Sequence, residues 1–146
     1  MTYRNPLPVA VLLLPIRTET GKFGVLVEIR NIPPWVGKPA LPGGYLELSD
    51  SGFEAAAARE VREELGLVVP PDRLRLSHSF CTGKEVLVFV RCDLCFTTDE
   101  IHRQFRPSTE ALQYDVSFGE AELAFPSHTE AASSFLSEIN AKKNGD

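Results

Sequence analysis

Short runs of apolar residues, separated by turn residues, recur along most of this chain. Such runs predict β-strands near residues 7–16, 24–31, 74–81, 85–97 and 111–118. Apolar residues at a spacing of four predict a helix over 52–65, and a second helix is expected over 127–141. Strands with one helix in the middle and one at the end favour an α/β fold, in which a mixed sheet lies between helices. The turn at 18–22 is expected to join the first two strands as a hairpin.

The first predicted helix has recognisable ends. Ser51 and Glu54 stand at the spacing of a capping box, so the helix is expected to start near Ser51. Gly66 follows the last apolar position, where a left-handed glycine commonly ends a helix. The buried stripe is expected to consist of Phe53, Ala57, Val61 and Leu65. The rest of the helix surface can therefore present polar side chains.

Three carboxylates, Glu60, Glu63 and Glu64, lie on one side of this helix. Residues three and four apart on a helix are neighbours, so these like charges repel by roughly 0.2–0.5 kcal/mol per exposed pair. A Mg²⁺ ion would turn the repulsion into coordination, since it binds carboxylate and water oxygens and bridges to phosphates. The alternative is a solvated Glu-rich face. The tight Pro-Gly-Gly turn at 42–44, directly before the helix, favours the metal site.

Residues 44–67 resemble the box motif of the Nudix hydrolases, which reads Gly, five residues, Glu, seven residues, Arg-Glu-aliphatic-x-Glu-Glu-x-Gly-aliphatic. The second half matches at every specified position: Arg59, Glu60, Val61, Glu63, Glu64, Gly66 and Leu67. The first half departs from the motif, because Asp50 replaces the glutamate and eight residues separate it from Arg59. The additional residue lies either in the loop before the helix or within the alanine run at 55–58.

The resemblance implies an α/β/α sandwich and hydrolysis of a diphosphate bridge by water activated at Mg²⁺ or Mn²⁺. It implies that Glu60, Glu63 and Glu64 bind the metal, with Gly44 counted among the metal-binding positions. It further implies that Arg59 orients Glu60 during catalysis.

A fourth catalytic carboxylate from outside the helix often completes such sites. The resemblance favours Glu110, which directly precedes a predicted strand, while Glu100 and Glu120 are alternatives. A solvated loop position is the other interpretation of Glu110. Asp50, despite its shorter side chain, is expected to support the loop as the family's glutamate does.

Four residues near the box are candidates for binding substrate. Trp35 is expected either to stack on a base or ribose or to cover the core beneath its loop. Arg30 and Lys38 are candidates for phosphate contacts or for surface ion pairs, and Tyr45 for lining the pocket or for packing.

The stretch at 122–128 resembles the Leu-Ala-Phe-x-x-His segment of Nudix domains in the ADP-ribose and NAD-metabolism branch. This favours a Mg²⁺-dependent pyrophosphohydrolase that cleaves a nucleoside diphosphate linked to another group, with ADP-ribose as the leading substrate. His128 is expected to pack at the start of the last helix rather than to catalyse. One alternative is a nucleoside triphosphate pyrophosphohydrolase that clears damaged nucleotides. Another is a catalytically silent nucleotide-binding domain.

Length and charge set the remaining expectations. The 146 residues fit one domain spanning 1–146, with a frayed tail at 144–146. A net charge of −5 disfavours binding of a nucleic-acid polymer. The apolar run within 6–16 is interrupted by prolines and is expected to be a buried strand rather than a signal peptide. With no apolar stretch of about 18 residues, a cytoplasmic location without membrane contact is expected. Related enzymes are often homodimers, so a homodimer is an option here.

Cys81, Cys92 and Cys95 are expected to be reduced, partly buried thiols. Cys92 and Cys95 are spaced as in a zinc site, but no second C-x-x-C pair completes four ligands. They are also expected to lie in one strand, where residues three apart point to opposite faces.

Overall fold

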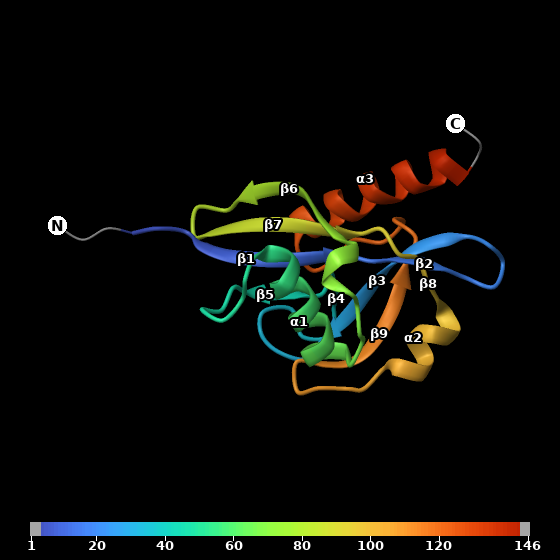
Figure 1. Ribbon diagram of the computed structural model, residues 1–146, viewed down its shortest axis with the longest axis horizontal. Helices are drawn as coiled ribbons and strands as arrows, with labels where there is room; N and C mark the ends of the chain where they lie inside the picture. The colour runs from blue at the N-terminus through green and yellow to red at the C-terminus, as the bar shows by residue number, and fades with distance from the viewer. Residues whose placement is uncertain (1–3, 144–146) are drawn as a thin grey trace.

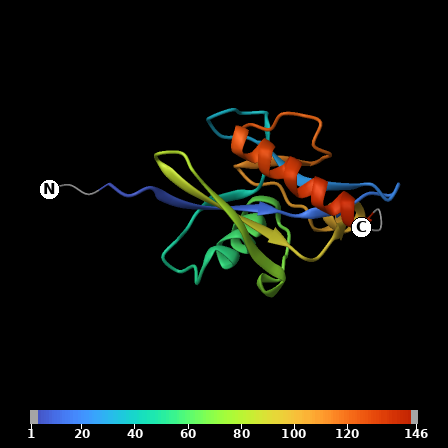
Figure 2. The same cartoon turned by 90° about the horizontal axis from the view of Figure 1, so that it is seen from above.

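The computed structural model describes residues 4–143 of the chain. Within that part, two β-sheets lie between helix α1 on one side and helix α3 on the other (Figures 1 and 2). The strands are β1 (Leu7–Leu13), β2 (Pro15–Arg17), β3 (Phe23–Arg30), β4 (Pro39–Ala40), β5 (Gly43–Tyr45), β6 (Leu74–Cys81), β7 (Glu85–Cys92), β8 (Phe96–Thr97) and β9 (Ala111–Ser117). The helices are α1 (Phe53–Leu65), α2 (Thr98–Gln104), α3 (Pro126–Lys143) and the short 3-10 helix η1 (Pro71–Arg73). The predicted α/β fold is confirmed.

The two sheets are both of mixed direction. The first has the strand order β5-β1-β7-β6, in which β1 runs parallel to β7 and antiparallel to β5. The second has the order β4-β3-β2-β8, with β9 pairing antiparallel to β3. The hairpin expected at 18–22 joins β2 to β3, and Thr18 N–H donates to the carbonyl of Lys22 at 3.0 Å.

Two predicted strands each divide between the sheets. The run at 7–16 is β1 of the first sheet and β2 of the second, and the chain crosses at the fully buried Leu14. The run at 85–97 likewise becomes β7 and β8, separated by residues 93–95. Because β1 pairs with β7 and β2 with β8, both parallel, the two chain segments cross together. The prediction of single strands was therefore wrong at these two places.

Helices α1 and α3 each cover a separate hydrophobic core. The core on the α1 side includes Ala10, Leu12, Leu26, Ala57, Val61 and Leu65. The core on the α3 side includes Val11, Leu13, Val25, Val27, Ala132 and Phe135. Successive residues of β1 and β3 thus enter opposite cores, because side chains alternate along a strand. A central strand that is buried on both faces reads in sequence as a continuous apolar run.

Helix α1 ends as predicted but begins differently. Gly66 adopts the left-handed conformation (φ 76°), and its N–H donates to the carbonyl of Arg62. The helix begins at Phe53 with Gly52 as the N-cap, and no side chain caps it, so the capping box expected at Ser51 was wrong. Asp50 holds the entry loop instead, through contacts described below. The alanine run is part of the regular helix, and Ala56 and Ala57 are fully buried.

The sequence analysis predicted helix α3 but not helix α2. Helix α3 was expected over 127–141 and is slightly longer. Helix α2 was missed, although Thr97 accepts a hydrogen bond from the Glu100 N–H in the manner of an N-cap. None of the helices in residues 4–143 has the length and apolar character needed to cross a membrane.

Deleting one alanine from the run at 55–58 is expected to abolish cooperative unfolding. The deletion rotates the rest of α1 by about 100° and turns Val61 and Leu65 away from the core. As a matched control, Ala58→Gly keeps the register and is expected to cost only about 1 kcal/mol. Urea unfolding followed by circular dichroism measures both. A deletion variant as stable as Ala58→Gly would show that α1 accepts a shifted register.

Candidate metal centre

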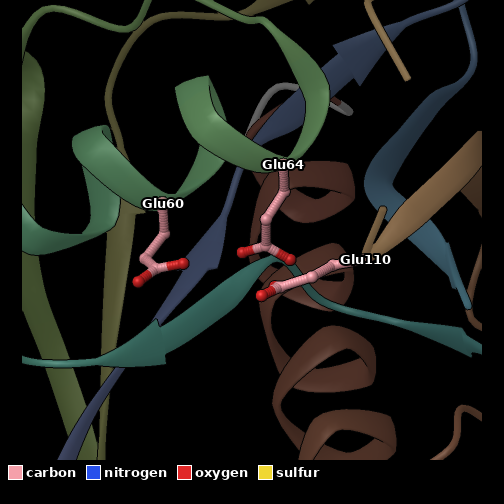
Figure 3. Close-up of side chains that lie close together, drawn as sticks. All are labelled: Glu60, Glu64 and Glu110. Atoms are coloured by element: carbon pink, nitrogen blue, oxygen red, sulfur yellow. The ribbon is translucent and has the colours of Figure 1, made fainter. Parts of the chain in front are cut away.

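Three carboxylates converge beside helix α1. Glu60 and Glu64 project from consecutive turns of α1, and Glu110 reaches them from the residue before β9 (Figure 3). One oxygen of each lies within 4.8 Å of the others. The structure thus brings the candidate outside carboxylate, Glu110, to the helix acids. Among the described residues, Glu100 and Glu120 are not part of this group.

Gly44 makes room for this group. It lies in β5, opposite Ala10 of β1, and faces the carboxylate of Glu60. A Cβ atom at position 44 would stand 2.5 Å from the Glu60 carboxyl carbon, so no other residue fits there without displacing Glu60. The glycine that the box motif requires is therefore explained by close approach to a carboxylate.

Arg59 fastens the loop before α1 to the helix. Its Nε and Nη2 atoms donate to the two carboxylate oxygens of Asp50, each at 2.9 Å, and Nη2 also donates to the Tyr45 carbonyl. Its Nη1 atom donates to Glu60 at 2.9 Å and to Glu63 at 3.1 Å. Bidentate arginine–carboxylate pairs are among the stronger protein hydrogen bonds. The Arg59 guanidinium holds the pKa of Asp50 below its usual range, and Asp50 supports the loop as expected.

Glu63 lies apart from the other two helix acids. Its side chain is about half exposed (53%) and pairs with Arg59 rather than joining Glu60, Glu64 and Glu110. A role for Glu63 as a metal ligand remains a prediction.

A fourth acid, Glu28 of β3, was missed by the sequence analysis. It is 4% exposed, and its carboxyl group interacts with that of Glu64. Burial and the neighbouring carboxyl group raise the pKa of Glu64, and burial raises the pKa of Glu28 and Glu60. The sequence feature that could have identified Glu28 was its charge within the otherwise apolar run at 24–29. Charged residues are almost never fully buried unless they are paired.

The residues present fit a divalent cation. Glu64 is 3% exposed, yet its Oε1 atom has no hydrogen-bond partner among the described residues. Buried polar atoms normally have a hydrogen-bond partner, and a bound ion is one of the accepted explanations for an exception. The donors are all carboxylate oxygens, which hard cations such as Mg²⁺ and Mn²⁺ prefer.

A cleft of about 640 Å³ lies on the α3 side of the molecule. Trp35 and Lys38 line it, with the Lys38 ammonium 4.7 Å from the centre of the Trp35 ring. Arg30 lies over the ring of Phe125, another lining residue, and donates to the Pro34 carbonyl. No residue of the acidic group lines the cleft.

Tyr45 and His128 both make hydrogen bonds within the fold. Tyr45 is exposed, and its hydroxyl donates to Glu85 at 2.7 Å. His128 is buried, and its Nδ1 atom accepts from the Leu41 N–H at 3.2 Å, in line with the packing role expected for it. Burial and the nearby positive charge of Arg30 lower the pKa of His128 to about 4, so the ring is neutral at pH 7.

The three cysteines are free thiols. Burial raises the pKa of Cys92 and of Cys95, which keeps both protonated at neutral pH. Cys92 and Cys95 were expected to lie in one strand and to point to opposite faces. That prediction was wrong, because β7 ends at Cys92 and both residues line one cavity of about 200 Å³. Among the described residues, no cysteine belongs to a cluster that could hold a metal ion.

The chain belongs to the Nudix domain family, since the sequence model of the NUDIX domain matches residues 6–138. The family comprises hydrolases that are typically pyrophosphatases. The group of Glu60, Glu64 and Glu110 is consistent with the divalent-metal site of that family. No curated protein matches the chain.

Solved structures share the fold at low sequence identity. A MutT/nudix family protein from Enterococcus faecalis superposes with a TM-score of 0.74 at 17% identity, covering 96% of this chain and 64% of that one. The NUDIX domain of Shewanella oneidensis NrtR, complexed with ADP ribose, gives 0.72 at 15% identity, covering 96% of this chain and 90% of that one. A C. elegans Ap4A hydrolase in a binary complex gives 0.67 at 17% identity, with coverage of 94% and 99%. The chain thus spans slightly less than two thirds of the Enterococcus protein.

Replacing Arg59 by lysine is expected to destabilise the fold by about 1–3 kcal/mol, because lysine cannot donate to both oxygens of Asp50 at once. Arg62→Lys is the matched control, since Arg62 is an exposed arginine on the same helix and is expected to change stability by less than about 0.5 kcal/mol. Urea unfolding compares the two. Equal effects would mean that the Arg59–Asp50 pair does not hold the loop.

Proposed function

We propose that this protein is a Mg²⁺- or Mn²⁺-dependent pyrophosphohydrolase that cleaves the diphosphate bridge of a nucleoside diphosphate linked to another group. The observation that carries the proposal is the convergence of Glu60, Glu64 and Glu110, with a buried and unpartnered oxygen on Glu64. Three carboxylates provide the charge and the oxygen donors that hold a divalent cation next to a phosphate.

Each residue of the centre has a distinct part in this proposal. Glu60 and Glu64 hold the cation, and Glu110 completes the site from the β9 side or accepts a proton from the attacking water. Arg59 orients Glu60 through its 2.9 Å hydrogen bond, while Gly44 leaves the space that Glu60 occupies. The bound cation supplies charge neutralisation for the diphosphate oxygens and makes water more acidic.

The cleft on the α3 side is the proposed place for the nucleoside. Trp35 offers an aromatic face for stacking, and its backbone is held in the left-handed region (φ 64°), which a bulky residue seldom adopts. Arg30 connects the cleft to the acids, because it lies over Phe125 and its charge also acts on Glu28. With the nucleoside bound in the cleft, a diphosphate that extends toward the acidic group would pass Arg30.

ADP-ribose is the leading substrate within this class. The segment that resembles the ADP-ribose branch supplies Leu123, Ala124 and Phe125 to the cleft. The Shewanella NUDIX domain, which shares the fold, was solved with ADP ribose. Both observations support this choice over a nucleoside triphosphate.

Replacing Glu64 by glutamine is expected to leave the fold intact and to lower turnover by more than about 100-fold, because a ligand carboxylate is lost. Hydrolysis is measured on ADP-ribose, nucleotide sugars, dinucleotide polyphosphates and nucleoside triphosphates, each with Mg²⁺ or Mn²⁺. Glu120→Gln is the matched control and is expected to keep wild-type rates, since Glu120 is exposed and lies outside the acidic group.

The substrate panel distinguishes the proposed function from its alternatives. Rapid hydrolysis of ADP-ribose with monophosphate products supports the proposal. A preference for nucleoside triphosphates would replace it with the nucleotide-clearing activity. A folded protein that binds nucleotides but hydrolyses none of them would be a binding domain, and turnover unchanged in Glu64→Gln would remove Glu64 from the chemistry.

Replacing Trp35 by alanine is expected to raise KM for the nucleotide about tenfold or more with little change in kcat, because a stacking contact contributes about 1–3 kcal/mol. Val36→Ala is the control. Val36 is also exposed and adjacent, but it is not among the residues lining the cleft. Steady-state kinetics on the preferred substrate compares the two variants. Equal KM values would place the nucleoside elsewhere.

A further inference from the structure

Of the three converging acids, Glu110 alone lies outside a helix or strand. It directly precedes β9 and is exposed. Ala111, the first residue of β9, packs into the core beneath α1, so strict alternation would direct Glu110 to the opposite face of the sheet. An oxygen of Glu110 nevertheless lies within 4.8 Å of oxygens of Glu60 and Glu64 (Figure 3). The backbone before β9 is therefore held in an irregular course that turns this side chain toward α1.

The pairing of β9 with β3 is irregular at the same place. One residue of β9, Leu112, is skipped where the register shifts between Ile29 and Arg30. A β-bulge of this kind bends its strand and changes the direction of the side chains beside it. The last paired residue of β9 is Ala111, so Glu110 lies just beyond the end of the ladder. The position of Glu110 therefore depends on contacts other than strand pairing.

Asn31 provides such contacts. Its backbone N–H donates to the carbonyl of Glu110 at 2.9 Å, and its side-chain Nδ2 atom donates to the carbonyl of Thr109 at 3.0 Å. Two donors of one residue thus hold two consecutive peptide groups, which restrains the backbone from which the Glu110 side chain projects. The backbone bond is available to any residue except proline, whereas the bond to Thr109 requires the side-chain amide of Asn31.

Asn31 is also the first residue of the loop that carries Trp35. This loop is closed at its base, where the Arg30 N–H donates to the Lys38 carbonyl at 3.0 Å. The same loop therefore carries the aromatic residue that lines the cleft and the amide that holds the segment before β9. A substitution at Asn31 can act through either of them, and the two routes differ in whether KM or kcat changes.

We propose that Asn31 is a positioning residue for the Glu110 carboxylate, because its amide holds the Thr109 carbonyl so that Glu110 faces Glu60 and Glu64. This role rests on the proposed function, in which Glu110 completes the cation site or accepts a proton from the attacking water. Asn31 acts through Glu110 and is not itself a catalytic residue. A small displacement of a catalytic group lowers the rate steeply, so loss of the amide is expected to reduce kcat about tenfold.

The test is a double-mutant cycle of Asn31→Ala and Glu110→Gln, with kcat and KM measured on the preferred substrate at saturating Mg²⁺. Asn31→Ala is expected to lower kcat about tenfold and to leave KM within about twofold of the wild-type value. In the Glu110→Gln background, the same substitution is expected to cause no further loss, because the group that it positions is gone. Asn140→Ala, at an exposed position of α3, is the matched control and is expected to keep wild-type kinetics.

The proposal is overturned if Asn31→Ala keeps the wild-type kcat, or if it causes an equal loss in the Glu110→Gln background. A raised KM with unchanged kcat would assign Asn31 to the loop of Trp35 instead, and wild-type turnover in Glu110→Gln would leave no catalytic group for Asn31 to position. In each of these cases, hydrolysis that is lost in Glu64→Gln keeps the proposed function standing. If the wild type hydrolyses no substrate of the panel, both fail together. If Asn31→Ala does not fold, Asn31→Ser, whose side chain is too short to reach Thr109, completes the same cycle.

Discussion

The constraint on which this structure depends is the burial of carboxyl groups between helix α1 and the sheets. Glu28, Glu60 and Glu64 are all buried there, and removing an ionised carboxylate from water is costly unless it is paired. Arg59 neutralises the side toward Glu60, but no comparable partner reaches the side toward Glu28 in the described residues. The fold therefore leaves buried carboxyl oxygens without a hydrogen-bond partner, and burial raises the pKa of all three groups. A divalent cation would match these oxygens in both charge and donor type.

The loop before α1 is organised around the same guanidinium. Asp50 has a shorter side chain than the glutamate of the family motif, yet it accepts two hydrogen bonds from Arg59 and one from the Glu47 N–H. The alanine run is packed in a regular helix, whereas Asp50 reaches Arg59 from the loop. With this one-residue difference from the motif, Arg59 still contacts both Asp50 and Glu60.

The sequence predicted what depends on local spacing. The period of four in α1 and its end at Gly66 follow from short-range patterns. The approach of Glu110 to the helix acids was expected from the family resemblance and not from local spacing. The division of residues 7–16 between two sheets could not be predicted, since a strand buried on both faces shows no alternation to mark the crossing. Glu28 was missed because one charge in an apolar strand acquires meaning only when Glu64, far along the chain, packs against it.

The acidic group lies where the two sheets and the helix meet. Gly44 belongs to β5 of the first sheet, Glu28 and Glu110 to β3 and the start of β9 in the second, and Glu60 and Glu64 to α1. Any ion bound there would cross-link parts of the chain that otherwise meet mainly through apolar packing. Binding of the ion would then stabilise the folded protein as well as support its activity. When the metal is scarce, the protein would be less stable and more readily degraded.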